Sequence, residues 1–159
     1  MRHLTWLVAL ALLTLLFNNW LYEQQNPNQV LSAANVDLGT PVVLKRNRQG
    51  HYVASGLVNE QPIVFLLDTG ATVISVPENI AERIGLEKGS AVQVGTANGS
   101  IEVYSTLIDR VQLGHIVLTN VRGHINPYMN GETALLGMSF LKHLELQQSG
   151  DTLELNIPN

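Results

Sequence analysis

Phe65-Leu66-Leu67-Asp68-Thr69-Gly70-Ala71-Thr72 is the stretch that decides how this sequence folds. Its apolar first part favours a buried strand, and the strand ends at a carboxylate. A carboxylate at the edge of a core normally has a partner, because burying it unpaired costs on the order of several kcal/mol. Gly70 permits a sharp turn and can offer its N–H to the Asp68 side chain, while Thr69 adds a hydroxyl that both donates and accepts hydrogen bonds. The stretch predicts a strand that delivers an acid to a tight turn.

The sequence from Val42 onward predicts an all-β domain, because short apolar or alternating runs are separated by Gly, Asn and Pro. Proline at the first turn and Gly85 as the stop favour a short helix over residues 77–85, and a second short helix is predicted over 139–143. Residues 125–133 are polar and read as irregular. The strands are predicted at residues 51–58, 63–67, 73–76, 91–96, 101–107, 107–113, 116–121, 144–146 and 152–156.

The dipeptide Asn98-Gly99 lies between the predicted strands 91–96 and 101–107. Asn-Gly between two apolar runs is the strongest short-range signal for a β-hairpin. We therefore expect a glycine-tipped hairpin shortly after the acid-bearing turn. On local sequence alone it is equally typical of an ordinary hairpin and of a mobile flap over a binding site.

The N-terminal residues 1–22 predict a membrane anchor, followed by a polar linker at 23–41 and a folded domain at 42–159. Residues 4–17 carry no charge, and Trp20 and Tyr22 are aromatic residues suited to a membrane interface. A cleaved signal peptide is the alternative, although the sequence after the apolar run is a poor cleavage site. Arg2 on the short flank predicts that the N-terminus lies in the cytoplasm and the folded domain outside, which fits a bacterial inner-membrane protein whose domain faces the periplasm.

The composition excludes several other classes of protein. The net charge is -4 and no basic patch is present, which argues against binding to nucleic acid. The chain has no cysteine, and its five histidines show no metal-ligand spacing, so neither a metal nor another cofactor is expected.

A second motif, Ala134-Leu135-Leu136-Gly137-Met138, follows the acid-bearing turn with the hairpin between them. The two motifs in this order resemble the retropepsin-like aspartic proteases, and in particular their bacterial membrane-anchored branch. The resemblance covers about residues 45–159 and implies a half-barrel fold that is active as a two-fold homodimer.

The resemblance also implies a mechanism, in which each chain of the homodimer contributes one Asp68 to a pair of carboxylates that activates a water. General acid–base hydrolysis of a peptide bond needs both carboxylates, and the pair shares one proton. Thr69 would bond across the two-fold axis, and Gly70 would orient the carboxylate. Alanine at position 71, where pepsin-type enzymes often have serine, predicts a pH optimum on the order of 4–6.

A polypeptide or peptide substrate would lie extended between the hairpin and the carboxylates, bound largely through its backbone. Val73, Val94 and Ile101 are further candidates for pocket walls, although residues of this kind more often belong to a core. The residues expected to contact the substrate are Ala71, Asn98, Gly99, Leu135, Leu136 and Gly137.

Two other interpretations stay open at this stage. The same fold can serve as a non-catalytic dimeric module that binds peptides or assembles partners in the cell envelope. Alternatively, the protease could process itself and release its domain from the anchor through the exposed linker.

Overall fold

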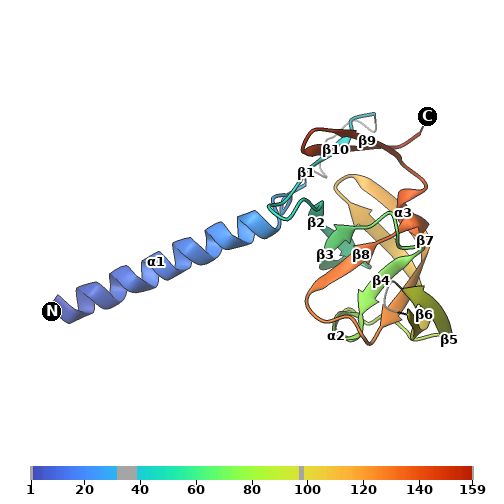
Figure 1. The fold of residues 1–159 in the computed structure, drawn as a ribbon, viewed down its shortest axis with the longest axis horizontal. Coiled ribbons are helices and arrows are strands. Elements are labelled where there is room, and N and C mark those ends of the chain that lie inside the picture. Colours follow the sequence, from blue (N-terminus) through green and yellow to red (C-terminus); the bar gives the residue numbers. More distant parts are fainter. Residues whose placement is uncertain (1, 32–38, 97–98, 159) are drawn as a thin grey trace.

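The computed structural model describes residues 2–31, 39–96 and 99–158 of the 159-residue chain. It consists of a long N-terminal helix that extends away from a β domain carrying two short helices (Figure 1). This confirms the predicted all-β class and the short helices. The elements are α1 (Arg2–Gln25), β1 (Val42–Lys45), β2 (Val53–Val58), β3 (Gln61–Leu67), β4 (Ile74–Pro77), α2 (Glu78–Arg83), β5 (Ala91–Thr96), β6 (Gly99–Leu113), β7 (Ile116–Asn126), β8 (Thr133–Leu136), α3 (Met138–Leu141), β9 (Glu145–Ser149) and β10 (Thr152–Asn156).

The larger sheet has seven strands in the order β2-β3-β8-β4-β7-β6-β5. Two of its pairings are parallel: β3 with β8, and β4 with β7. Because β2 also pairs with the end of β6, the sheet curls round on itself into a partial barrel. The parallel pairings bring together segments that are far apart in the sequence, which is how the barrel assembles its site.

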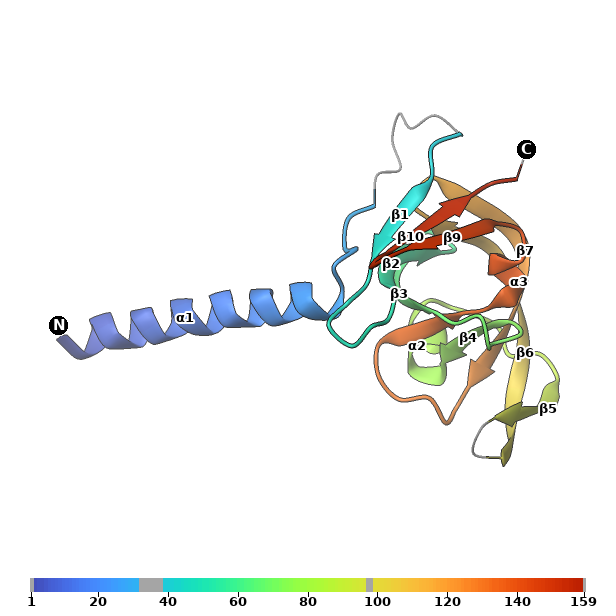
Figure 2. The same cartoon turned by 45° about the horizontal axis from the view of Figure 1, so that its top comes forward.

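The smaller sheet has the order β1-β10-β9 and is antiparallel throughout (Figure 2). Strand β1 alternates buried and exposed residues, as expected for a strand with one face on a core. The two sheets and both short helices enclose one apolar core. Its fully buried members include Leu44, Phe65, Ile74, Ile108, Leu136, Phe140 and Leu155.

Strands β1 and β8 were not among the strands predicted from the sequence, and two further differences concern β6 and β7. The predicted strands 101–107 and 107–113 are one continuous strand of 15 residues, β6, which pairs with β5, β7 and β2 along its length. Strand β7 continues to Asn126, so its last residues are not irregular. The continuation is held on both sides, since β6 and β4 each pair with this end of β7.

Helix α1 contains a 20-residue apolar stretch, Trp6–Gln25, with none of it buried against the rest of the protein. By length and composition this helix could cross a membrane, and a signal sequence would have the same properties. In Figure 1 it leaves the β domain as a single straight rod.

The chain immediately after α1 is attached to the β domain by two buried asparagines, Asn26 and Asn28. The amide nitrogen of Asn28 donates to the carbonyls of Lys45 (2.8 Å) and Val53 (2.7 Å), and its oxygen accepts the Lys45 N–H at 2.7 Å. The Asn26 side chain donates to the Ser55 hydroxyl at 3.0 Å. The first part of the predicted linker therefore contacts the domain, whereas residues 32–38 lie outside the described part of the chain.

Candidate active site

Asp68 follows the last residue of β3 and is half-buried at the end of that strand. Its backbone N–H donates to the Leu136 carbonyl at 3.1 Å, which ties the strand end to β8. The Gly70 N–H donates to Asp68 Oδ1 at 2.9 Å, and the Ala71 N–H donates to the Asp68 carbonyl at 3.2 Å. The turn thus fixes one oxygen of the carboxylate and leaves the other available.

The segment that follows β8 supports this turn from below. The Met138 N–H donates to the Ala71 carbonyl at 2.8 Å, and the Ser139 N–H donates to the Thr72 carbonyl at 2.9 Å. Gly137 is buried beneath the turn, where a β-carbon would lie 2.6 Å from the Ala71 oxygen. Only glycine allows the two backbones to approach this closely.

A cleft of about 530 Å³ opens beside Asp68. The sheet forms its floor, and the hairpin of β5 and β6 forms one wall; Figure 2 shows this hairpin at the end of the domain far from α1. The volume lies within the usual range for ligand pockets. The cleft is lined by Asp68, Gly70, Ala71, Thr72, Val73, Ser75, Val94, Gly95, Thr96, Ile101, Val103, His124, Asn126 and Leu135.

Most of the residues predicted from the sequence converge on this cleft. Ala71 and Leu135 line it together with Asp68 and Gly70, and so do the pocket candidates Val73, Val94 and Ile101. The β5–β6 pairing, which runs to Thr96 opposite Gly99, shows that the predicted hairpin exists.

Four of the predicted site residues lie elsewhere. Thr69 is exposed at the surface of the turn, and Gly99 is exposed at the start of β6. Leu136 is fully buried in the core, so it contributes its carbonyl to the turn rather than a side chain to the cleft. Gly137 lies beneath the turn, and Asn98 is outside the described residues.

Sequence reasoning missed the polar residues that the sheet contributes to the cleft floor, namely Ser75, His124 and Asn126. His124 and Asn126 are two apart on β7 and therefore point to the same face of the sheet. Their alternation with the apolar Ile125 was the available signal, but residues 125–133 read as polar and irregular. Burial lowers the pKa of His124 below its ordinary value, and the nearby positive charge of Arg122 lowers it further.

Within residues 2–31, 39–96 and 99–158, no group of three or more His, Asp or Glu side chains is arranged to hold a metal ion. The acid of the cleft is Asp68, and no second carboxylate lines the cleft among these described residues. The described part of one chain therefore presents one carboxylate on a backbone turn beside a cleft lined by polar and apolar residues.

The combination of a curled sheet, an Asp-Thr-Gly turn and a supporting glycine is the architecture of the half-barrel aspartic protease fold. Residues 54–143 match the sequence profile of the family described as "gag-polyprotein putative aspartyl protease". The crystal structure of a retropepsin-like aspartic protease from Rickettsia conorii superposes with a TM-score of 0.60 at 28% identity, covering 74% of this chain and 90% of that protein. The chain belongs to the retropepsin-like aspartic protease family.

Two curated relatives show the same kinship at the sequence level. An uncharacterized protein encoded in the cobV 5′ region of Sinorhizobium sp. is 32% identical over 143 residues, which is 87% of this chain. An uncharacterized protein of Rickettsia prowazekii is 28% identical over 107 residues, which is 65% of this chain. The chain spans 61% and 46% of the length of these two relatives.

Proposed function

We propose that this protein is an aspartic endopeptidase that activates a water between two Asp68 carboxylates, one from each chain of a homodimer. The observation that carries the proposal is Asp68 itself, held by the Gly70 N–H and facing a cleft of peptide-binding size. Peptide hydrolysis requires one group that takes a proton from the water and another that hydrogen-bonds the scissile carbonyl. Because the described part of one chain offers a single carboxylate in the cleft, a second copy supplies the other.

The surroundings of Asp68 suit such an arrangement. Thr69 is exposed beside it and makes no side-chain hydrogen bond within the described residues, so its hydroxyl is free to bond the equivalent turn of a second copy. Ala71 and Leu135 would contact substrate from the floor. The hairpin of β5 and β6, with Gly95 at the cleft wall, would close over an extended peptide and exclude water.

In this proposal the enzyme acts at a membrane surface, which the length and composition of α1 support. An uncleaved α1 would anchor the chain in a bacterial inner membrane, with the β domain in the periplasm. Confinement to one surface raises the effective concentration of the two chains, so a dimer that is weak in solution would still form in place.

A non-catalytic dimeric module remains the second candidate, since it uses the same fold and the same cleft. The intact Asp-Thr-Gly turn favours the enzyme, because a module that only binds peptides has no need for an acid in its cleft. Replacing Asp68 separates the two. The change abolishes the activity of an enzyme, whereas it leaves peptide binding by a module essentially intact.

The decisive experiment digests a mixture of denatured peptides with the full-length protein in detergent, at high protein concentration and across pH 3–8. Asp68→Asn is the test variant. Asp109→Asn is the matched control, because this substitution makes the same chemical change at an exposed position of β6 outside the cleft. We expect cuts that peak at mildly acidic pH and vanish in Asp68→Asn but persist in Asp109→Asn. Empty digests from every protein, with dimers confirmed in the same samples, would favour the binding module.

The membrane assignment has its own test. Full-length protein expressed in bacteria should stay with membranes after an alkaline wash, and the β domain should be cleaved by a protease added to spheroplasts. Recovery of a soluble domain that lacks α1 would instead indicate a cleaved signal sequence or self-processing. Only the Asp68→Asn variant distinguishes those two, because it blocks self-processing alone.

A further inference from the structure

The floor of the cleft next to the catalytic turn is polar, and three neighbouring strands build it. Ser75 on β4 is paired with His124 on β7 and with Leu135 on β8. Residues paired on neighbouring strands point to the same face of the sheet. The Ser75 hydroxyl and the His124 ring therefore stand side by side in the cleft that also contains Asp68.

Asn126 extends this polar floor by one more position along β7. Its side-chain oxygen accepts the Tyr128 backbone N–H at 2.9 Å. A backbone N–H donates only to the oxygen of the side-chain amide, so the NH2 group of Asn126 points away from the Tyr128 N–H. This NH2 group has no hydrogen-bond partner within residues 2–31, 39–96 and 99–158, and Asn126 lines the cleft.

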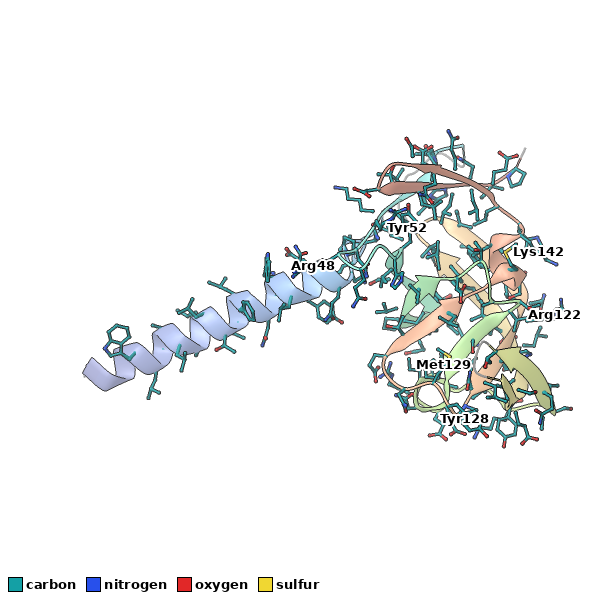
Figure 3. The ribbon with its side chains drawn as sticks, viewed as in Figure 1. Arg48, Tyr52, Arg122, Tyr128, Met129 and Lys142 are labelled. Atoms are coloured by element: carbon teal, nitrogen blue, oxygen red, sulfur yellow. The ribbon has the colours of Figure 1, made fainter. Side chains whose placement is uncertain are left out.

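The other two groups of the floor are also incompletely paired. The Ser75 hydroxyl donates to the sulfur of Met129 at 3.2 Å, and Figure 3 shows Met129 beside β4. A thioether is a weak acceptor, so the hydroxyl gains by turning to an oxygen. The His124 ring has no hydrogen bond to any described residue. Three hydrogen-bond donors therefore face one part of the cleft, and none of them is paired with a strong acceptor among the described residues.

We propose that Ser75, His124 and Asn126 form a subsite that binds an acidic side chain of the substrate, Asp or Glu, close to the bond cleaved at Asp68. The inference rests on the proposed endopeptidase function and specifies its substrate class. A carboxylate offers acceptors for the hydroxyl, the amide and the ring together. Charge-assisted hydrogen bonds of this kind are about twice as strong as neutral ones.

The charged groups around His124 make the subsite sensitive to pH. Arg122 on the same strand adds a positive charge, and Asp68 is the acid of the same cleft. The partners of His124 on β4 and β6, Ser75 and Ser105, are uncharged.

The remaining charged groups on neighbouring elements lie in separate grooves. Helix α3 packs on β7, and Lys142 and His143, which follow α3, line one groove with Arg122. Figure 3 labels Lys142 and Arg122 on the side of the domain away from α1. Glu87 and Lys88 line another groove with Ser105. Arg122 lines both of these grooves and is not among the residues of the cleft. Protonation of His124 therefore supplies the positive charge of the floor, and acidic side chains are preferred most below the pKa of His124 and above their own value of about 4.3.

The test profiles the residues that flank each cut when the full-length protein digests a peptide mixture at pH 5. A pair of peptides that differ only by Glu or Gln at the enriched position is then compared at pH 5 and pH 7.5. The ratio of their kcat/KM values cancels the ionisation of the Asp68 pair, because both peptides use the same catalytic groups.

We expect Asp or Glu to be enriched at one position, with a Glu/Gln ratio that falls as the pH rises. His124→Gln should reduce this ratio about tenfold at pH 5 and remove its pH dependence. Ser75→Ala should lower the ratio at both pH values and keep the pH dependence. His143→Gln, an exposed histidine outside the cleft, should change nothing.

Cleavage without acidic enrichment, or an enrichment that His124→Gln leaves intact, would overturn the subsite while the endopeptidase stands. An absence of cleavage, with dimers confirmed in the same samples, would overturn the endopeptidase. The subsite is then tested by peptide binding instead. Peptides retained from the same mixture by Asp68→Asn protein at pH 5 should be richer in acidic residues than those retained by the Asp68→Asn, His124→Gln double variant. Equal acidic content in the two retained sets would reject the subsite.

Discussion

Gly137 lies so close under Val73 that a β-carbon at position 137 would stand 2.3 Å from the Val73 carbonyl oxygen. Backbone meets backbone at this point, so no side chain can move aside to make room. This close backbone contact packs the segment that follows β8 against the segment that follows the Asp68 turn. The requirement for glycine in the second motif is therefore steric, and it concerns the support of the turn rather than contact with substrate.

Gly137→Ala should destabilise the fold by about 3 kcal/mol, because the turn and α3 must separate to admit a methyl group. Urea denaturation monitored by circular dichroism measures the change. Gly95→Ala is the control, since a β-carbon at Gly95 meets nothing within 4 Å and the residue lies in a strand. A Gly137→Ala protein as stable as Gly95→Ala would show that the two backbones can move apart at little cost.

Ser139 makes a second link beneath the active-site turn, and it is buried. Its hydroxyl accepts the Ile74 N–H at 3.0 Å and donates to the Arg122 carbonyl at 2.8 Å, which joins β4 to β7 through α3. Ser139→Ala should cost about 2 kcal/mol, because it leaves a buried N–H and a carbonyl unpaired. Ser149→Ala, at an exposed position of β9, should cost nothing measurable in the same denaturation experiment.

The sequence was sufficient to predict the features that depend on local signals. The turn at Asp68, the hairpin around Gly99 and the helix after Pro77 each follow from neighbouring residues, and each is present in the structure. The expected split of β6 at Leu107 was wrong, because no glycine or proline interrupts the strand and β7 pairs along it. Neighbouring strands decide how far a strand extends, and a single sequence does not show them.

The polar floor of the cleft could not be predicted for the same reason. Ser75 and His124 are brought together by the parallel pairing of β4 and β7. Parallel strands are not joined by a hairpin, so no local turn signal in the sequence predicts this pairing. Leu136 was expected to contact substrate, yet its position on β8 turns it into the core and turns Leu135 toward the cleft. A shift of one residue along a strand reverses the face, so motif matching alone does not separate these two roles.

Asn28 should control how firmly the end of α1 is held to the β domain. Asn28→Asp replaces the side-chain NH2 group, which donates to two carbonyls, by a carboxylate oxygen that repels them. The segment after α1 should therefore detach locally from the β domain. Amide hydrogen exchange in the full-length protein measures this directly: the N–H groups of Lys45 and Ser55, which are bonded to Asn28, should exchange faster. Asn130→Asp, in an exposed loop, should leave both amides protected.

His124 should make the fold less stable at acidic pH. In the folded protein, burial and Arg122 hold the pKa of His124 below its ordinary value of 6.5, so the unfolded chain takes up the proton first as the pH falls. Above about pH 6.5 the ring is neutral in both states and contributes no pH dependence. Between that value and the lower folded pKa, the free energy of unfolding decreases with falling pH, and the loss is complete below the folded pKa.

Replacing the ring isolates its contribution from those of the other titrating groups. His124→Gln should therefore lose less stability than the unaltered protein between pH 7.5 and pH 5, whereas His143→Gln should follow the unaltered protein. Arg122→Gln should give an intermediate result, because it removes the smaller of the two causes and raises the pKa of His124 toward its ordinary value. Urea denaturation at each pH gives the stabilities, and an NMR titration of the ring gives the pKa. A His124 ring that titrates at or above 6.5 would reverse the expected order of the variants.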